Sequence, residues 1–136
     1  MREQMVARCD HIEEAYEFML AYAAQGLASD AGSNAGSQVR QFLSRLDAAL
    51  TGLGDVFRAV VAAETPAAAD KYAPFIAVLD RDAAAAQAAV QLVLAQPGIS
   101  SQLVDNLNAS IHLRALLTDI FLVDETLKGS QAATKA

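Results

Sequence analysis

Two histidines and a single cysteine are the residues of this 136-residue chain best suited to metal binding or nucleophilic chemistry. Cys9 and His11 lie together in the stretch RCDHIEEAYEF. The same stretch holds four carboxylates, Asp10, Glu13, Glu14 and Glu17. Thiol, imidazole and carboxylate groups at such short spacing are the groups from which metal sites and acid–base sites are built. They form one site only if they share a face of the element that carries them.

The spacing of apolar residues predicts that this stretch is helical, and a helix divides the cluster between two faces. At about 100° per residue, Cys9 falls with Ile12 and Tyr16 at the centre of an apolar stripe. The carboxylates fall on the opposite arc. We therefore expect Cys9 to be a small core residue with an inert thiol. We expect the carboxylates to form a solvated acidic face.

A metal site is not supported by the positions of the histidines. His11 and Glu14 are three residues apart and could share one ion, but a protein metal site needs more ligands than that. Carboxylate-bridged di-iron bundles place Glu three residues before each His. Those positions hold Arg8 and Ala109 here, so the motif is missing at both histidines. The sequence predicts no metal and no cofactor.

The second histidine, His112, leaves one alternative open. It shares a side of the last predicted helix with Asp119. If the first and last helices pack antiparallel, His11 comes level with Asp119, and His112 with Glu17. The alternative function is therefore a ligand- or metal-binding bundle using His11, Glu14, His112 and Asp119. An enzyme using these groups for acid–base chemistry is the least favoured hypothesis, because no catalytic motif is visible.

The elements that must position these residues are helices. Apolar residues recur at alternating steps of three and four, which is the pattern of a helical bundle seam. Punctuation by Gly, Pro and Ser divides the pattern into four helices, at 2–25, 38–63, 67–95 and 101–128. The sequence predicts an all-α, up-down-up-down antiparallel four-helix bundle over 1–128, with 129–136 a flexible C-terminal tail. A helical hairpin that dimerises is the structural rival.

Three segments of the predicted bundle contain Gly, Ser or Pro residues that affect where its helices begin and end. The small-residue segment 27–37 is predicted to be a mobile linker. Gly52 and Gly54 lie in the second helix, but the seam stays in phase across them, so we expect this helix to continue. For the third helix, either Thr65 caps it and Pro74 kinks it, or it begins near Asp70.

Charge and composition restrict the partners. The net charge of −6 argues against binding a nucleic-acid backbone or an anionic membrane, because both attract basic surfaces. No apolar run is long enough to predict a membrane span. One cysteine forms no internal disulfide, and the first residues lack the apolar run of a secretory signal. These features predict a cytoplasmic protein.

The aromatic residues outside the seams suggest a contact surface. Phe18 and Tyr22 lie beside His11 on the flank of the first helix. Exposed aromatic residues mark partner surfaces. The sequence therefore predicts a small cytosolic interaction or accessory protein that is not an enzyme. Its protein partner is unknown, and a homodimer is expected. The predicted interaction surface comprises His11, Glu14, Phe18, Tyr22, His112 and Asp119.

Overall fold

The computed structural model describes residues 1–135, and it describes side chains for residues 1–129. Over this range the chain is all-helical and contains no strand, which confirms the predicted fold class. The elements are α1 (Arg2–Ala24), α2 (Asn34–Leu50), α3 (Leu53–Glu64), the 3-10 turn η1 (Pro66–Ala68), α4 (Ala69–Leu94), α5 (Ser101–Ala109) and α6 (Ile111–Lys135). The predicted bundle of four continuous helices is not confirmed, because the described residues form six α-helices.

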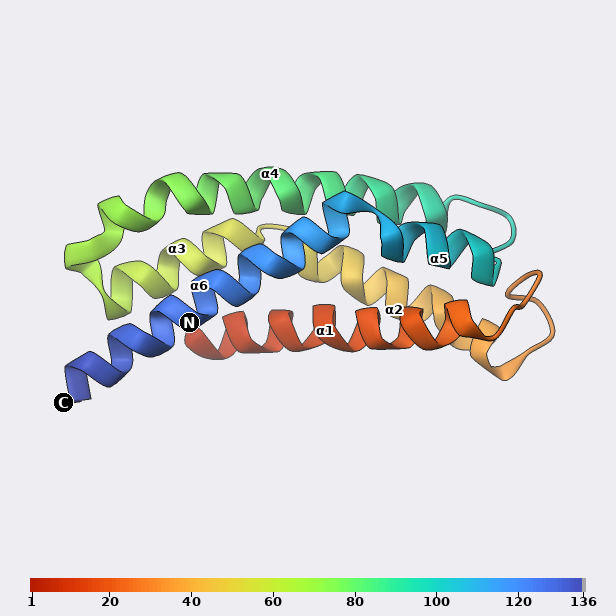
Figure 1. The fold of residues 1–136 in the computed structure, drawn as a ribbon, viewed down its shortest axis with the longest axis horizontal. Coiled ribbons are helices and arrows are strands. Elements are labelled where there is room, and N and C mark those ends of the chain that lie inside the picture. Colours follow the sequence, from red (N-terminus) through yellow and green to blue (C-terminus); the bar gives the residue numbers. More distant parts are fainter. Residues whose placement is uncertain (136) are drawn as a thin grey trace.

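The helices lie along one long axis (Figure 1). Helix α1 runs in one direction, α2 and α3 follow each other back, α4 runs forward again, and α5 and α6 return. Helix α1 packs on α2 and α5, whereas α6 packs on α4. None of the helices within the described residues is both long and apolar enough to cross a membrane.

The predicted helix 38–63 is wrong, because the chain breaks between α2 and α3 at its two central glycines. Gly52 adopts a left-handed conformation with φ 67°, which favours glycine over other residues. Gly54 is buried so closely against the carboxylate of Asp80 on α4 that a Cβ atom there would overlap it. Leu53 and Phe57 nevertheless stay in the core, so the seam continues through the break.

The predicted helix 101–128 is also wrong, because the chain breaks at Ser110. Its ψ of 128° is extended, and its N–H donates to the carbonyl of Leu107 as α5 ends. The break changes the direction of the chain, so α5 covers α1 while α6 covers α4. Helix α6 continues beyond the predicted end at Lys128. The predicted tail, 129–136, overlaps the end of this helix, and its last residue lies outside the described residues.

The other predicted boundaries agree more closely. Helix α1 matches the predicted 2–25 within one residue. Helix α2 begins earlier than predicted because the hydroxyl of Ser33 accepts from the N–H of Gly36 at 2.8 Å and caps it. Pro66 begins η1, and α4 then starts at Ala69, which agrees with the predicted start near Asp70. Pro74 lies inside α4.

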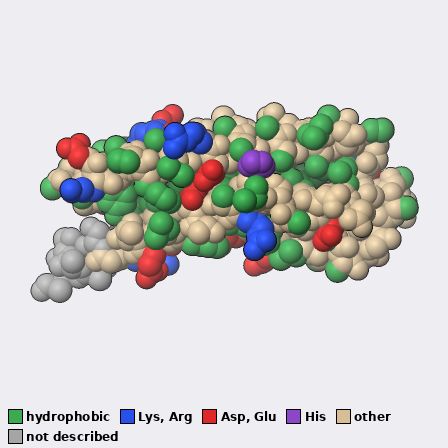
Figure 2. All heavy atoms as spheres, turned by 45° about the horizontal axis from the view of Figure 1, so that its top comes forward, with side chains coloured by type: hydrophobic (Ala, Val, Ile, Leu, Met, Phe, Trp, Pro, Cys, Tyr) green, Lys and Arg blue, Asp and Glu red, His purple; other side chains and the backbone are tan. Residues whose placement is uncertain are grey.

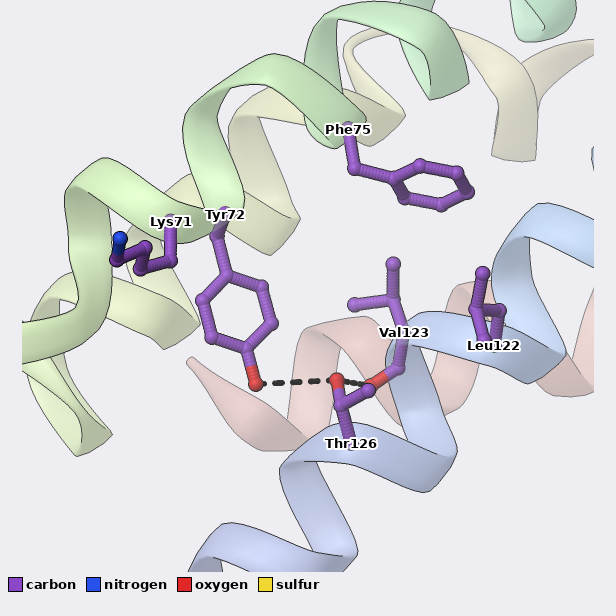
Figure 3. Close-up of a pocket in the computed structure, with 6 residues that line it drawn as sticks. All are labelled: Lys71, Tyr72, Phe75, Leu122, Val123 and Thr126. Atoms are coloured by element: carbon purple, nitrogen blue, oxygen red, sulfur yellow. Dashed lines mark hydrogen bonds between the residues drawn. The ribbon is translucent and has the colours of Figure 1, made fainter.

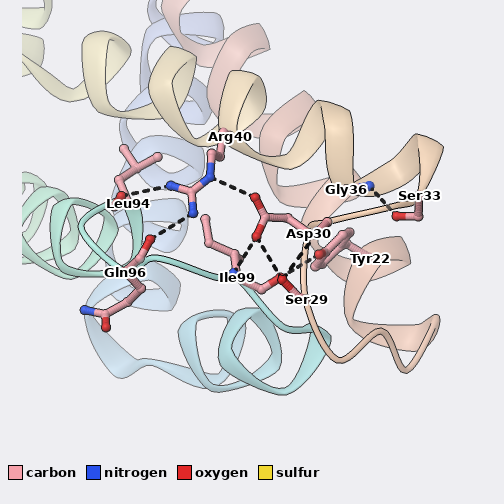
Figure 4. A network of polar contacts seen from close by, with 10 residues as sticks. Tyr22, Ser29, Asp30, Ser33, Gly36, Arg40, Leu94, Gln96 and Ile99 are labelled. Atoms are coloured by element: carbon pink, nitrogen blue, oxygen red, sulfur yellow. Dashed lines mark hydrogen bonds and ion pairs between the residues drawn. The ribbon is translucent and has the colours of Figure 1, made fainter.

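The segment 27–37, which we predicted to be mobile, is bound to the end of the bundle by its acidic residue (Figure 4). The Asp30 carboxylate accepts from the N–H of Ile99 at 2.7 Å and from Nε of Arg40 at 2.8 Å. Arg40 also donates to the carbonyls of Leu94 and Gln96 at the end of α4. The hydrogen bonds that Asp30 accepts from Ile99 and from Arg40 lower the pKa of its carboxyl group to about 2.

The buried side chains of Tyr22 and Ser101 also form hydrogen bonds at this end of the molecule. The Tyr22 hydroxyl donates to the carbonyl of Ile99 at 2.6 Å. The Ser101 hydroxyl donates to the carbonyl of Tyr22, and its oxygen accepts from the N–H of Leu27. We call the region from Tyr22 to Arg40 with Leu94 to Ser101 the closed end.

Candidate functional site

The structure separates the six residues of the predicted interaction surface. His11, Glu14 and His112 are exposed, Phe18 is half-buried, and Tyr22 and Asp119 are buried. No ion pair joins either histidine to a carboxylate among the described side chains. These same side chains include no group of three or more His, Cys, Asp and Glu that could hold a metal ion. The six residues therefore do not form one site.

The aromatic flank of α1 packs inside the molecule. Phe18 stacks on Phe42 of α2 with ring centroids 4.2 Å apart, and it also contacts the ring of Tyr22. Tyr22 is fully buried and holds the carbonyl of Ile99. The core is therefore wider than the predicted seam, and this flank is not a free surface for a partner.

Asp119 lies buried between α6 and α4, at 8% exposure, beside another carboxylate. Burial raises its pKa to about 7, and the neighbouring carboxylate of Asp82 on α4 contributes through a hydrogen bond and its charge. One carboxylate oxygen of Asp119, Oδ2, has no hydrogen-bond partner within the described residues. Asp119 therefore keeps its proton to higher pH than an ordinary aspartate, because burial and the nearby carboxylate both disfavour its charged form.

A groove lies between the first half of α1 and the second half of α6, with a volume of about 320 Å³. Its walls include Val6, Cys9 and Glu13 of α1 and Phe121, Asp124 and Lys128 of α6. The groove exists because α6 leaves α1 after the break at Ser110. We call this region the open end.

Carboxylates dominate the electrostatics of the groove. Burial raises the pKa of the Cys9 thiol to about 12, and the charges of Asp124, Glu13 and Asp10 add to this effect. The thiol is therefore protonated at neutral pH. Cys9 is half-buried in the wall of the groove, so it departs from the core position predicted for it. Burial also raises the pKa of Glu13, and the neighbouring acids Asp10 and Asp124 raise it further. Glu13 is half-buried, so it departs from the solvated face predicted for the α1 carboxylates.

A second groove lies on the other side of α6, against α4, with a volume of about 310 Å³ (Figure 3). Tyr72 and Phe75 of α4 point toward Val123 and Leu122 of α6. The Tyr72 hydroxyl is 3.0 Å from the hydroxyl of Thr126 and closes one end. The walls are mainly apolar.

Between the two grooves, α6 exposes two large apolar side chains. Phe121 is 54% exposed and Leu122 is 52% exposed, and we call this pair the α6 ridge. Figure 2 shows hydrophobic side chains over both halves of the face drawn, including the left half, in which Figure 1 places the second part of α6. The ridge and its two grooves form a continuous accessible surface with two large exposed apolar side chains at its centre.

The ridge was not predicted as a site, although the sequence holds a signal for it. The last predicted helix carries two apolar stripes, one through Leu107 and the other through Leu113. These two leucines are six residues apart. Alternating steps of three and four, as in the other seams, do not produce an interval of six. The interval marks the break at Ser110, and the break is what leaves Phe121 uncovered.

Comparison with protein-family models, with curated proteins and with solved structures gives no match to this chain. The case for a function therefore depends on the arrangement of these residues.

Proposed function

We propose that this chain is a small interaction or accessory protein that acts through protein–protein contacts, and that its contact surface is the α6 ridge with the grooves beside it. The observation that carries the proposal is the exposure of Phe121 and Leu122 between two hollows. Contiguous apolar surface of this kind marks partner sites, and aromatic side chains are enriched in the centres of interfaces.

The ridge is not needed for the core of the bundle. Helix α6 already buries Leu116, Ile120 and Val123 along its inner stripe. Phe121 and Leu122 extend on either side of that stripe, toward α1 and α4 respectively. Since a large exposed apolar side chain lowers solubility without adding to the core, a partner that covers the ridge is the functional reason for it.

The other predictions fit this proposal to different degrees. His11, Glu14 and His112 are exposed, and among the described residues they do not belong to a group of side chains that could hold a metal ion. This arrangement does not support the ligand- or metal-binding alternative. The homodimer and the cytoplasmic location stay predictions. Light scattering at micromolar concentration tests the homodimer, and a strict monomer would contradict it.

A co-purification experiment in the source cells tests the function. The double variant F121S/L122S removes the ridge, and Leu92→Ser is the matched control because Leu92 is 66% exposed on α4 away from it. We expect proteins that co-purify with the unaltered chain and with the control to be depleted at least about tenfold with the double variant. Identical sets from all three chains would contradict the proposal, as would no retained protein.

A further inference from the structure

The groove between α1 and α6 has the shape, lining and charge to receive one further helix. Resting on the proposed function, we propose that its occupant is a cationic amphipathic helix of a partner protein. The apolar face of that helix covers Val6, Cys9 and Phe121. Its Lys and Arg side chains reach Asp10 and Glu13.

The shape follows from the break at Ser110. Before the break, α5 packs along the second half of α1, and after it α6 packs on α4 instead. The first half of α1 is therefore flanked by α6 across a groove rather than by direct packing. Two neighbouring helices with a groove between them are the arrangement into which a third amphipathic helix packs.

The groove offers an apolar strip along its length. Val6 is 44% exposed on the α1 side, and Cys9 follows it one turn later, half-buried and protonated. Phe121 lies on the opposite wall, and Met5 is buried between the walls. Apolar side chains spaced three or four apart on an incoming helix would cover these positions.

The charges of the groove favour a basic occupant. Its two cations are already engaged, Arg2 by hydrogen bonds to Glu64 and Lys128 by an ion pair with Asp124 at 3.1 Å. Asp10 and Glu13 have no ion pair among the described residues. Burial raises the pKa of Glu13, repulsion from Asp10 raises it further, and a Lys or Arg from a partner would offset that repulsion.

A second copy of this chain fits the groove less well. The net charge of −6 repels another copy, and a second α6 would bring its own Asp124 and Glu125 against Asp10 and Glu13. Like charges placed together across an interface cost free energy and exclude wrong partners. The same charge disfavours an anionic membrane as the occupant.

Binding of a defined peptide tests the occupant. The probe is a labelled helix of about 18 residues, roughly five turns, with Leu on one face and Lys on the other. One comparison peptide carries Glu for Lys, and another has the same composition in scrambled order. The charge variant D10N/E13Q is compared with E14Q/E17Q, which changes two exposed carboxylates of the same helix by the same total charge.

We expect the Lys peptide to bind the unaltered protein, as measured by fluorescence anisotropy, and to bind better than either comparison peptide. D10N/E13Q should weaken binding at least about tenfold, and E14Q/E17Q less than about twofold. Equal weakening by the two pairs would overturn the proposal, because it would show attraction to total charge rather than to the groove.

Cys9 reports where the peptide binds, because it is the sole cysteine of the chain and lines the groove. We expect the peptide to slow labelling of its thiol at least about fivefold in the unaltered protein, in proportion to the bound fraction. Unchanged labelling at saturation would place the peptide elsewhere and overturn the proposal. If the Lys peptide does not bind while co-purification still depends on Phe121 and Leu122, the proposal of a cationic helix is overturned. The proposed function is not overturned by that result.

Discussion

The closed end and the open end of this molecule use their polar groups in opposite ways. At the closed end, Asp30 accepts from Ile99 and Arg40, and Arg40 donates to two carbonyls at the end of α4. At the open end, Asp10 and Glu13 line a groove and have no ion pair among the described residues. The same kind of side chain fixes two loops in one place and lines an accessible groove in the other.

The comparison shows that a shifted pKa is not by itself a sign of function. The lowered pKa of Asp30 has a structural cause, because its partners are the backbone and an arginine that also binds the end of α4. The raised pKa of Glu13 comes with acidic neighbours in an accessible groove. Shifted pKa values gather at functional sites, but structural ion-pair networks shift them too, so the partners of each group must decide.

The largest effect is expected from breaking the closed end with Asp30→Ala. The change removes the acceptor of the Ile99 N–H and leaves Arg40 without its carboxylate. Hydrogen bonds to charged groups contribute about 1.5–3 kcal/mol, so we expect a loss of about 2–4 kcal/mol in the free energy of unfolding. Urea denaturation at pH 7 measures it, with Asp105→Ala on the exposed face of α5 as control.

The pH dependence gives this prediction a second check. Because the folded pKa of Asp30 lies below its unfolded value of 3.8, its stabilisation is complete above about pH 4 and is lost as the pH falls toward 2. Asp30→Ala should flatten this part of the stability curve. A curve that keeps its acid slope in the variant would show that Asp30 does not hold the closed end.

A smaller effect is expected at Asp119, which lies between the two ends. Its folded pKa of about 7 is above its unfolded value of 3.8, so folding retains a proton that the unfolded chain releases. Stability should therefore fall as the pH rises from about 4 to 7 and stay low above that. Asp119→Asn keeps the shape, and its amide donates to Asp82, so we expect a gain of about 1–2 kcal/mol at pH 8.

Urea denaturation across pH 5 to 8 measures this effect, with Asp105→Asn as the matched control at an exposed position. The control should keep the slope of the unaltered chain. If Asp119→Asn keeps it as well, Asp119 is not the group that titrates, and its buried carboxylate does not limit stability.

Much of the fold could be predicted from the sequence because it depends on local pattern. The seam through Ile12, Leu43 and Val90 is buried as predicted, since a helix places residues three and four apart on one face. The exposure of Glu14 follows from the same periodicity. These features require only that the segment be helical.

The rest depends on contacts between segments distant in the sequence. Nothing local says that Gly54 must approach Asp80, or that Asp82 and Asp119 meet across two helices. Asp30 looked like part of a mobile linker because its partner, the N–H of Ile99, comes from another loop. The groove itself appears only when the break at Ser110 is placed in three dimensions.

The smallest effect on stability is expected at the open end, from Phe121→Ser. Burying a large apolar side chain stabilises a protein by about 1.5–3 kcal/mol, but Phe121 is 54% exposed and contributes only about half of that. We therefore expect the free energy of unfolding to fall by about 0.7–1.4 kcal/mol. Leu116→Ala on the buried stripe of α6 should cost about 2–5 kcal/mol in the same urea titration. A loss above about 2 kcal/mol for Phe121→Ser, which is within the range of a core substitution, would mean that Phe121 serves the fold, and the ridge would then no longer require a partner to explain it.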